Sequence, residues 1–161
     1  MKVIALRGDK NVGKTSILKK LMSKLLTGGG RLVESWHRNE VVYQMIDPND
    51  DKWLKRGDKG EISDLTVTLE YKGSIITITS LGDMEKIIFR ELEKAKLRLK
   101  KKGTKGEIAV YICACHPGMN IASLPGCDHV SYIDKEKCES ADMMNDDKFI
   151  DDLVFELDKS I

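Results

Sequence analysis

The sequence predicts an α/β fold: a three-layer sandwich in which a mainly parallel sheet with one antiparallel hairpin strand lies between two layers of helices. The chain opens with a short apolar run, 3–6, that is followed by an amphipathic stretch, 14–27. Two strand-like runs, 65–71 and 75–79, come next, and a second amphipathic stretch then leads to another apolar run, 108–113. Strands and helices that alternate along a chain in this way are typical of sheets that helices cover on both faces.

The first strand and the first helix are predicted from two different hydrophobic patterns. All four residues of 3–6 are apolar, which is typical of a strand buried on both faces. Over 14–27 apolar residues recur at helical spacing with lysines between them, and three glycines, 28–30, end the helix. The apolar positions of this helix are Ile17, Leu18, Leu21, Met22 and Leu25.

The stretch 31–46 gives no single prediction, because 32–33 and 41–46 could each form a strand. A polar and charged stretch, 47–61, follows, and we expect it to form a long loop. Long loops within compact domains are often functional. This loop is therefore a candidate contact for a small molecule or a protein partner.

A hairpin and a second helix come next. Apolar and polar residues alternate over 65–71, as in a strand with one buried face, and the turn at 72–73 makes 75–79 its antiparallel neighbour. A helix is predicted between Gly82 and Gly103. Its apolar face consists of Ile88, Leu92, Ala95 and Leu99.

The last part of the chain predicts two further strands, 108–113 and 130–133, and a C-terminal amphipathic helix. The apolar face of that helix consists of Ile150, Leu153, Val154 and Leu157. The sequence contains no internal repeat. We therefore expect residues 1–161 to form a single domain.

The charge of the chain argues against nucleic acid and membranes as partners. Because 27 Lys and Arg nearly balance 26 Asp and Glu, the net charge of +1 creates no field that would attract either. The longest apolar run, 108–115, is too short to span a bilayer, and Arg7 interrupts the apolar start where a secretory leader would continue. We expect a cytoplasmic protein whose cysteines are reduced.

A glycine-containing loop lies between the first strand and the first helix. Its sequence is Gly8-Asp9-Lys10-Asn11-Val12-Gly13-Lys14-Thr15, which fits the pattern G-x-x-x-x-G-K-[ST], known as Walker A. The glycines let the backbone turn successive N–H groups inward around an anion, and the helix that follows adds its positive end. The sequence therefore predicts a phosphate-binding loop.

The residues at the end of this loop have the chemistry that a nucleotide requires. The ammonium group of Lys14 can reach the β- and γ-phosphates of a nucleotide, and the hydroxyl group of Thr15 can bind Mg²⁺, with Ser16 beside it. The alternative is an ordinary turn in which a Lys-Thr pair occurs by chance. The position between a buried strand and an amphipathic helix favours the phosphate-binding loop.

With this motif in this context, the chain resembles the P-loop NTPase superfamily. The resemblance implies that a nucleoside triphosphate binds with Mg²⁺ at the carboxyl ends of the strands. Members of the superfamily usually have an acidic residue near the end of a second buried strand. Here the candidate strand, 74–80, ends in hydroxyl groups, and the first acid is Asp83. Asp83 could support the metal or the attacking water, or it could cap the next helix, and both interpretations stay open.

Two weaker resemblances bear on the choice of nucleotide. The run 78–83 is loosely similar to a segment of small, uncharacterised bacterial P-loop ATP-binding proteins. The hairpin followed by a glycine-containing loop is similar to the small GTPases, but the N-K-x-D pattern that recognises guanine in that family does not follow 108–113. We therefore expect ATP rather than GTP.

Three functions are compatible with these features. The first is a Mg²⁺-dependent nucleoside triphosphatase with slow or switch-like turnover, in which Lys14 and Asp83 are catalytic and Thr15 and Asp83 bind the metal. The second is a small-molecule or nucleotide kinase, for which the charged candidates are Glu34, His37, Arg38, Lys55, Arg56, Arg90 and Arg98. The third is a non-catalytic nucleotide-binding module, because the acid at the strand end is missing.

Cysteine and histidine residues also raise a zinc hypothesis. They occur at 113–116, at 127–129 and at 138. This spacing matches no compact zinc motif, so we favour buried or free thiols.

Overall fold

A computed structural model describes residues 1–10, 12–37, 40–41, 64–135 and 143–161 of the chain. In chain order its elements are β1 (Lys2–Arg7), α1 (Lys14–Thr27), β2 (Arg31–His37), β3 (Glu40–Val41), β4 (Thr66–Tyr71), β5 (Ser74–Thr79), α2 (Glu85–Lys101), β6 (Ile108–Cys115), the short 3-10 turn η4 (Ile121–Ser123), β7 (His129–Asp134) and α3 (Met143–Ser160). Each strand and helix that a clear hydrophobic pattern predicts is present. The ambiguous stretch after α1 contributes β2 and β3.

The described strands form one sheet of seven, in the order β3-β2-β4-β5-β6-β1-β7. One half of the sheet is parallel: β6 pairs with β5 and with β1, and β1 pairs with β7. The other half is antiparallel: β2 pairs with β3 and with β4, and β4 pairs with β5. The predicted α/β class, with a mixed sheet and an antiparallel β4–β5 hairpin, is confirmed. The antiparallel part extends beyond the single hairpin strand that we expected, because β2 pairs with β4 instead of continuing the parallel part.

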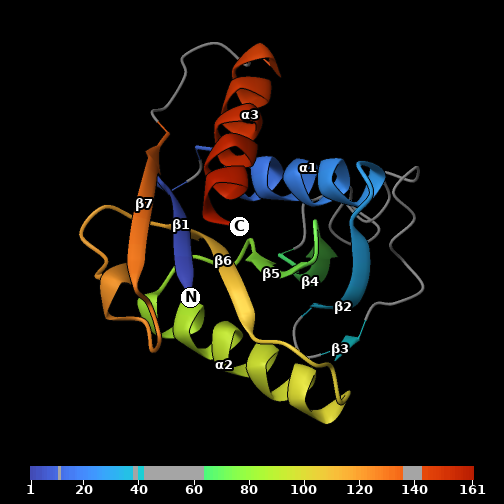
Figure 1. Cartoon of the computed structure of the whole chain (residues 1–161). Helices are drawn as coiled ribbons and strands as arrows, with labels where there is room; N and C mark the ends of the chain where they lie inside the picture. Colours follow the sequence, from blue (N-terminus) through green and yellow to red (C-terminus); the bar gives the residue numbers. More distant parts are fainter. Residues whose placement is uncertain (11, 38–39, 42–63, 136–142) are drawn as a thin grey trace.

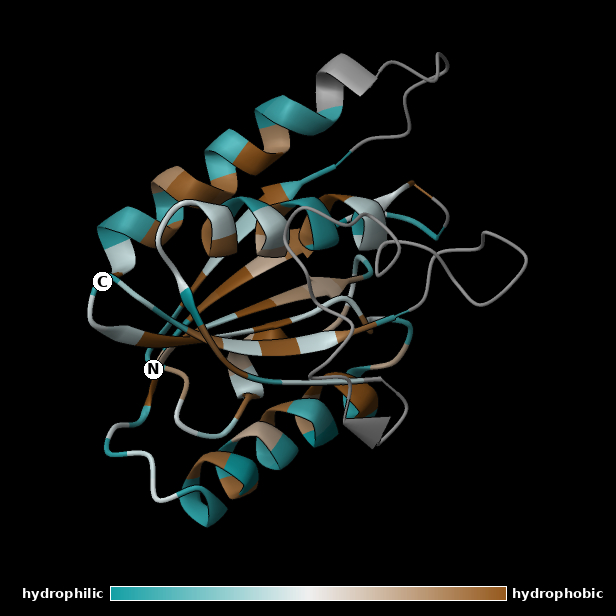
Figure 2. Ribbon diagram, turned by 90° about the vertical axis from the view of Figure 1, so that its right-hand side faces the viewer, coloured by the Kyte–Doolittle hydropathy of each residue, from teal (hydrophilic) through white to brown (hydrophobic). Residues whose placement is uncertain are grey.

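Helices cover both faces of the sheet, with α1 and α3 on one face and α2 on the other (Figure 1). Along β1 the side chains of Ile4 and Leu6 pack with α1 and α3, while those of Val3 and Ala5 pack with α2. Burial on both faces explains why this strand is a continuous apolar run. Figure 2 shows the same pattern by hydropathy, with apolar stretches along the central strands and mixed surfaces on the helices.

Helix α2 ends at the predicted glycine. Gly103 has a φ of 66°, and its N–H donates to the carbonyl oxygen of Lys100 over 3.1 Å. The N–H of Thr104 donates to the carbonyl oxygen of Leu99 over 3.2 Å. These two bonds form a Schellman motif, which requires the left-handed conformation that glycine adopts at least cost.

Helix α3 combines apolar and charged contacts with the rest of the domain. Ile150, Leu153 and Leu157 are buried in the core on the α1 side of the sheet. Three ion pairs flank them: Lys20–Asp146 at 3.0 Å, Lys24–Asp151 at 2.7 Å and Lys72–Asp158 at 2.8 Å.

Part of the prediction cannot be compared with this fold. The expected loop at 47–61 lies outside the described residues, as does Cys138. Among the helices that the structure describes, none is long and apolar enough to cross a membrane.

Candidate functional site

The predicted phosphate loop connects β1 to α1. Gly13 has a φ of 86°, and its carbonyl oxygen accepts the N–H of Ile17 over 3.2 Å, which starts the helix. At the other end of the loop, the N–H of Gly8 donates to the carbonyl oxygen of Cys115 over 3.1 Å. The Gly8 amide is thus engaged with β6, so the later amides of the loop are the candidates for an anion. Asn11 lies outside the described residues.

Gly8 is also required by close packing. A Cβ atom at this position would lie 2.6 Å from the carbonyl oxygen of Lys135, the residue that follows β7. The N–H of Lys135 in turn donates to the carbonyl oxygen of Arg7 over 2.7 Å. The end of β7 therefore fixes the start of the loop from the side opposite to β6.

Lys14 folds back over the loop. Its Nζ donates to the carbonyl oxygens of Gly8 and Asp9, each over 2.6 Å, and only 8% of the residue is exposed. Burial lowers the pKa of Lys14, and the neighbouring Cys115, Asp83 and Asp9 oppose that shift. Among the described residues, the hydrogen-bond acceptors of this ammonium group are carbonyl oxygens, and an anionic partner would bind it more strongly.

A cavity of about 560 Å³ opens beside this lysine, at the carboxyl ends of β1, β5 and β6. Ligands of open α/β sheets bind at this edge. The residues that line the cavity are Lys10, Gly13, Lys14, Thr15, Ser16, Asp64, Ser80, Gly82, Asp83, Ala114 and His116. The structure thus brings Lys10, Gly13, Lys14, Thr15, Ser16 and Asp83, all predicted site residues, to one cavity.

Asp64, which the sequence prediction missed, also lies in this cavity. Its Oδ1 accepts the Thr15 hydroxyl over 3.3 Å and the Ser80 hydroxyl over 3.4 Å. Burial raises the pKa of Asp64; the Thr15 and Ser80 hydroxyls and Lys19 oppose this shift, while Asp83 adds to it. The only signal in the sequence was an acid directly before a predicted strand, which fits no motif.

Asp83 reaches the same cavity from the connection between β5 and α2. Its side chain is 74% exposed, and its Oδ1 lies 3.6 Å from Nε2 of His116. The N-cap of α2 is Met84, so Asp83 stands one residue before the position where a side chain would cap this helix. Asp83 therefore does not occupy the capping position of α2, and it lines the cavity.

Gly82 allows β6 to approach this connection closely. A Cβ atom on Gly82 would lie 2.3 Å from the carbonyl oxygen of Ala114. Because glycine has no side chain, the backbone can pass directly over the end of β6 and form one wall of the cavity.

The charged residues considered for a kinase are not brought to this cavity where the structure describes them. Nη1 of Arg98 donates to Oε1 of Glu34 over 3.0 Å, and Arg98 lies over the ring of Trp36. Arg90 pairs with Glu91 at 3.6 Å. The side chain of His37, and the whole of Arg38, Lys55 and Arg56, lie outside the description.

The cysteines that the structure describes are free. Burial raises the pKa of Cys115 to about 11 and that of Cys113 well above its usual value. Within the described ranges, no group of three or more His, Cys, Asp or Glu side chains is placed to hold a metal ion. Cys113 and Cys115 are therefore buried thiols of the core, and Cys127 is partly buried.

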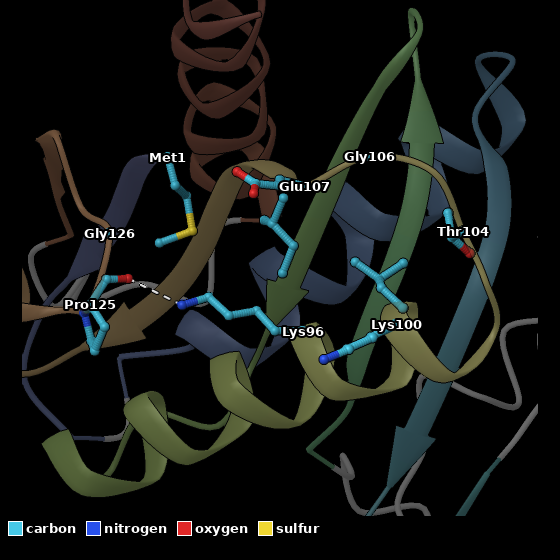
Figure 3. Close-up of a pocket in the computed structure, with 10 residues that line it drawn as sticks. Met1, Lys96, Lys100, Thr104, Gly106, Glu107, Pro125 and Gly126 are labelled. Atoms are coloured by element: carbon cyan, nitrogen blue, oxygen red, sulfur yellow. Dashed lines mark hydrogen bonds between the residues drawn. The ribbon is translucent and has the colours of Figure 1, made fainter.

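A second cavity, of about 530 Å³, lies at the amino end of β6 beside the last turns of α2 (Figure 3). Nζ of Lys96 donates to the carbonyl oxygen of Pro125 across it, over 3.2 Å. Leu99 and Ile108 form apolar parts of its wall. It contains no residue of the phosphate loop, so the candidate site is the cavity at the other edge of the sheet.

No protein-family model, curated protein or solved structure matches the chain. The function must therefore be inferred from the geometry and chemistry of the site.

Proposed function

We propose that the protein binds ATP with Mg²⁺ in the cavity beside Lys14 and hydrolyses it slowly, as a switch or a low-turnover nucleoside triphosphatase. In this proposal the amides and Lys14 of the phosphate loop bind the triphosphate. Thr15 binds the metal, and a carboxylate of the cavity supports the metal or the attacking water; Asp83, the candidate from the sequence, and Asp64 both line the cavity.

The position of Lys14 is the observation that carries this proposal. Its ammonium group lies 2.6 Å from two carbonyl oxygens of a glycine-containing loop and lines a cavity of about 560 Å³. A phosphate oxygen would form a charge-assisted hydrogen bond with this group, which is stronger than a bond to a neutral carbonyl. The first turn of α1 adds free N–H groups and the positive end of the helix dipole at the same place.

The donor atoms in the cavity fit Mg²⁺. This ion prefers oxygen ligands and usually combines one or two carboxylates with water and phosphate oxygens. The lining residues provide the hydroxyl groups of Thr15 and Ser80 and the carboxylates of Asp64 and Asp83, and no cysteine is among them. When bound, the ion would neutralise charge on the phosphates.

The test is a calorimetric titration of ATP with Mg²⁺ into the wild-type protein and Lys14→Ala. Loss of one or more hydrogen bonds to a charged partner costs about 1.5–3 kcal/mol, so we expect ATP to bind roughly 10- to 100-fold more weakly to Lys14→Ala. Lys86→Ala, which removes an exposed lysine at the start of α2, serves as the control and should bind ATP like the wild type. Unchanged affinity in folded Lys14→Ala would contradict the proposal.

A non-catalytic nucleotide-binding module is the second candidate. Strand β5 ends at Thr79, and Ser80 follows, so no carboxylate stands at the strand end itself. Release of ADP and phosphate distinguishes the candidates. Slow release that depends on Mg²⁺ supports the triphosphatase, binding without release supports the module, and release that needs an added acceptor indicates a phosphotransferase.

A further inference from the structure

We propose that Asp64, not Asp83, is the carboxylate of the divalent-cation site, and that it acts by orienting the hydroxyl group of Thr15 toward the ion. The inference rests on the proposed binding of ATP with Mg²⁺ and deepens it by assigning the metal-side acid. Strand β5 ends in hydroxyl groups and supplies no acid itself. In this inference the acid lies two residues before β4, the antiparallel neighbour of β5.

The contacts of Asp64 support this assignment. Its Oδ1 accepts the hydroxyl group of Thr15 over 3.3 Å, so the lone pairs of the Thr15 oxygen are directed away from the carboxylate. The hydroxyl oxygen of Ser80 lies 3.4 Å from the same Oδ1 and 3.3 Å from the carbonyl oxygen of Leu65, which share its one proton as acceptors. A carboxylate that holds a ligand's proton in this way fixes the orientation of the ligand and strengthens it as a donor.

Ser80 connects Asp64 to the backbone of the sheet. Its Oγ accepts the N–H of Leu65 over 2.8 Å, and the backbone N–H of Ser80 donates to the carbonyl oxygen of Leu65 over 3.0 Å. Ser80 is 2% exposed. Leu65 and Ser80, which lie directly before β4 and directly after β5, are therefore hydrogen-bonded to each other beside Asp64.

The environment of Asp64 favours a cation beside it. The carboxylate is half-buried, and the carboxylate of Asp83 lines the same cavity. A divalent cation in the cavity would be attracted by the two carboxylates that line it.

Asp83 lacks these features. Its side chain is 74% exposed, and the structure pairs it with His116 rather than with Thr15. Asp64, in contrast, is hydrogen-bonded to the Thr15 hydroxyl. We therefore assign the orienting role to Asp64 and leave Asp83 with His116.

The test compares Asp64→Asn with the matched variant Asp83→Asn, which removes the same charge from the same cavity. ATP is titrated calorimetrically into each protein, once with Mg²⁺ and once with a chelator. Loss of a residue that orients a metal ligand typically lowers metal affinity about 10- to 100-fold, so Asp64→Asn should lose most of the gain that Mg²⁺ gives to ATP binding. Its affinity for metal-free ATP should be unchanged or higher, because a negative charge near the phosphates is gone. Asp83→Asn should keep most of the Mg²⁺ effect.

Three outcomes are decisive. If the wild-type protein binds no ATP with or without Mg²⁺, the proposed function itself fails and this inference fails with it. If the wild type gains affinity with Mg²⁺ and Asp64→Asn gains as much, or if Asp83→Asn loses the gain instead, only this assignment is overturned. Should Asp64→Asn not fold, Asp64→Ser keeps a hydroxyl group near Thr15 without the charge and is expected to lose the Mg²⁺ effect in the same way.

Discussion

At the scale of single residues, two glycines shape the candidate site by permitting close backbone contacts. Gly8 packs against the carbonyl oxygen of Lys135, and Gly82 packs against that of Ala114. Both contacts involve backbone atoms, which cannot rotate away as a side chain would. The glycines therefore let the ends of β6 and β7 approach the phosphate loop and the cavity wall.

Replacing Gly8 tests this packing. In Gly8→Ala the new Cβ would lie 2.6 Å from Lys135 O and 3.0 Å from Val12 Cγ2, so the loop must shift. Overpacking of this kind usually costs about 1–3 kcal/mol, and we expect a loss of that size in the free energy of unfolding, measured by urea denaturation. Asp9→Ala, at an exposed neighbour in the same loop, should stay within about 0.5 kcal/mol of the wild type. Equal stabilities for the two variants would show that the Gly8 contact is unimportant.

At the scale of elements, the C-terminal helix is held by its apolar face rather than by its ion pairs. Leu153 is fully buried, whereas the side chains of Lys24 and Asp151 are 52% and 69% exposed. Exposed ion pairs contribute little, because water and salt screen them and both side chains lose freedom. The burial of α3 is therefore the main contribution of this helix to stability.

Two substitutions separate these contributions. Leu153→Ala should lower the free energy of unfolding by about 2–5 kcal/mol, because it leaves a cavity in the core, while Lys24→Ala should lower it by less than about 1 kcal/mol. Chemical denaturation monitored by circular dichroism measures both. A loss for Lys24→Ala as large as that for Leu153→Ala would show that charge, not packing, docks the helix.

The elements also show how much of the fold and of the candidate site could be predicted from the sequence. Strand β1, helix α1, the β4–β5 hairpin and helix α2 were predictable, because each follows from a local hydrophobic period or a turn residue such as Gly103. The pairing of β2 with β4 was not, since it joins residues far apart in the chain and no local pattern encodes it. The same holds for Asp64: only the alignment of β4 with β5 brings it to Ser80 and to Thr15 of the phosphate loop.

At the scale of the whole molecule, one buried charge links the stability of the fold to pH. Lys19 lies on α1 with no exposed surface, and burial lowers its pKa to about 8 despite the opposing effect of Asp64. In the unfolded chain a lysine loses its proton near 10.5. Between these two values the unfolded state binds more protons than the folded state, so this group makes the fold more stable as pH rises through that range.

The prediction is that the free energy of unfolding of the wild type, minus that of Lys19→Met, increases by about 1–3 kcal/mol between pH 7 and pH 10. Methionine has a similar length and does not titrate, so the difference isolates the protonation of Lys19 from that of other groups. Urea denaturation at several pH values measures it. The corresponding difference for Lys86→Met, an exposed lysine, should change much less over the same range. A difference for Lys19→Met that stays constant or decreases with pH would mean that the buried ammonium group keeps its proton, and that its contact with Asp64 outweighs the cost of burial.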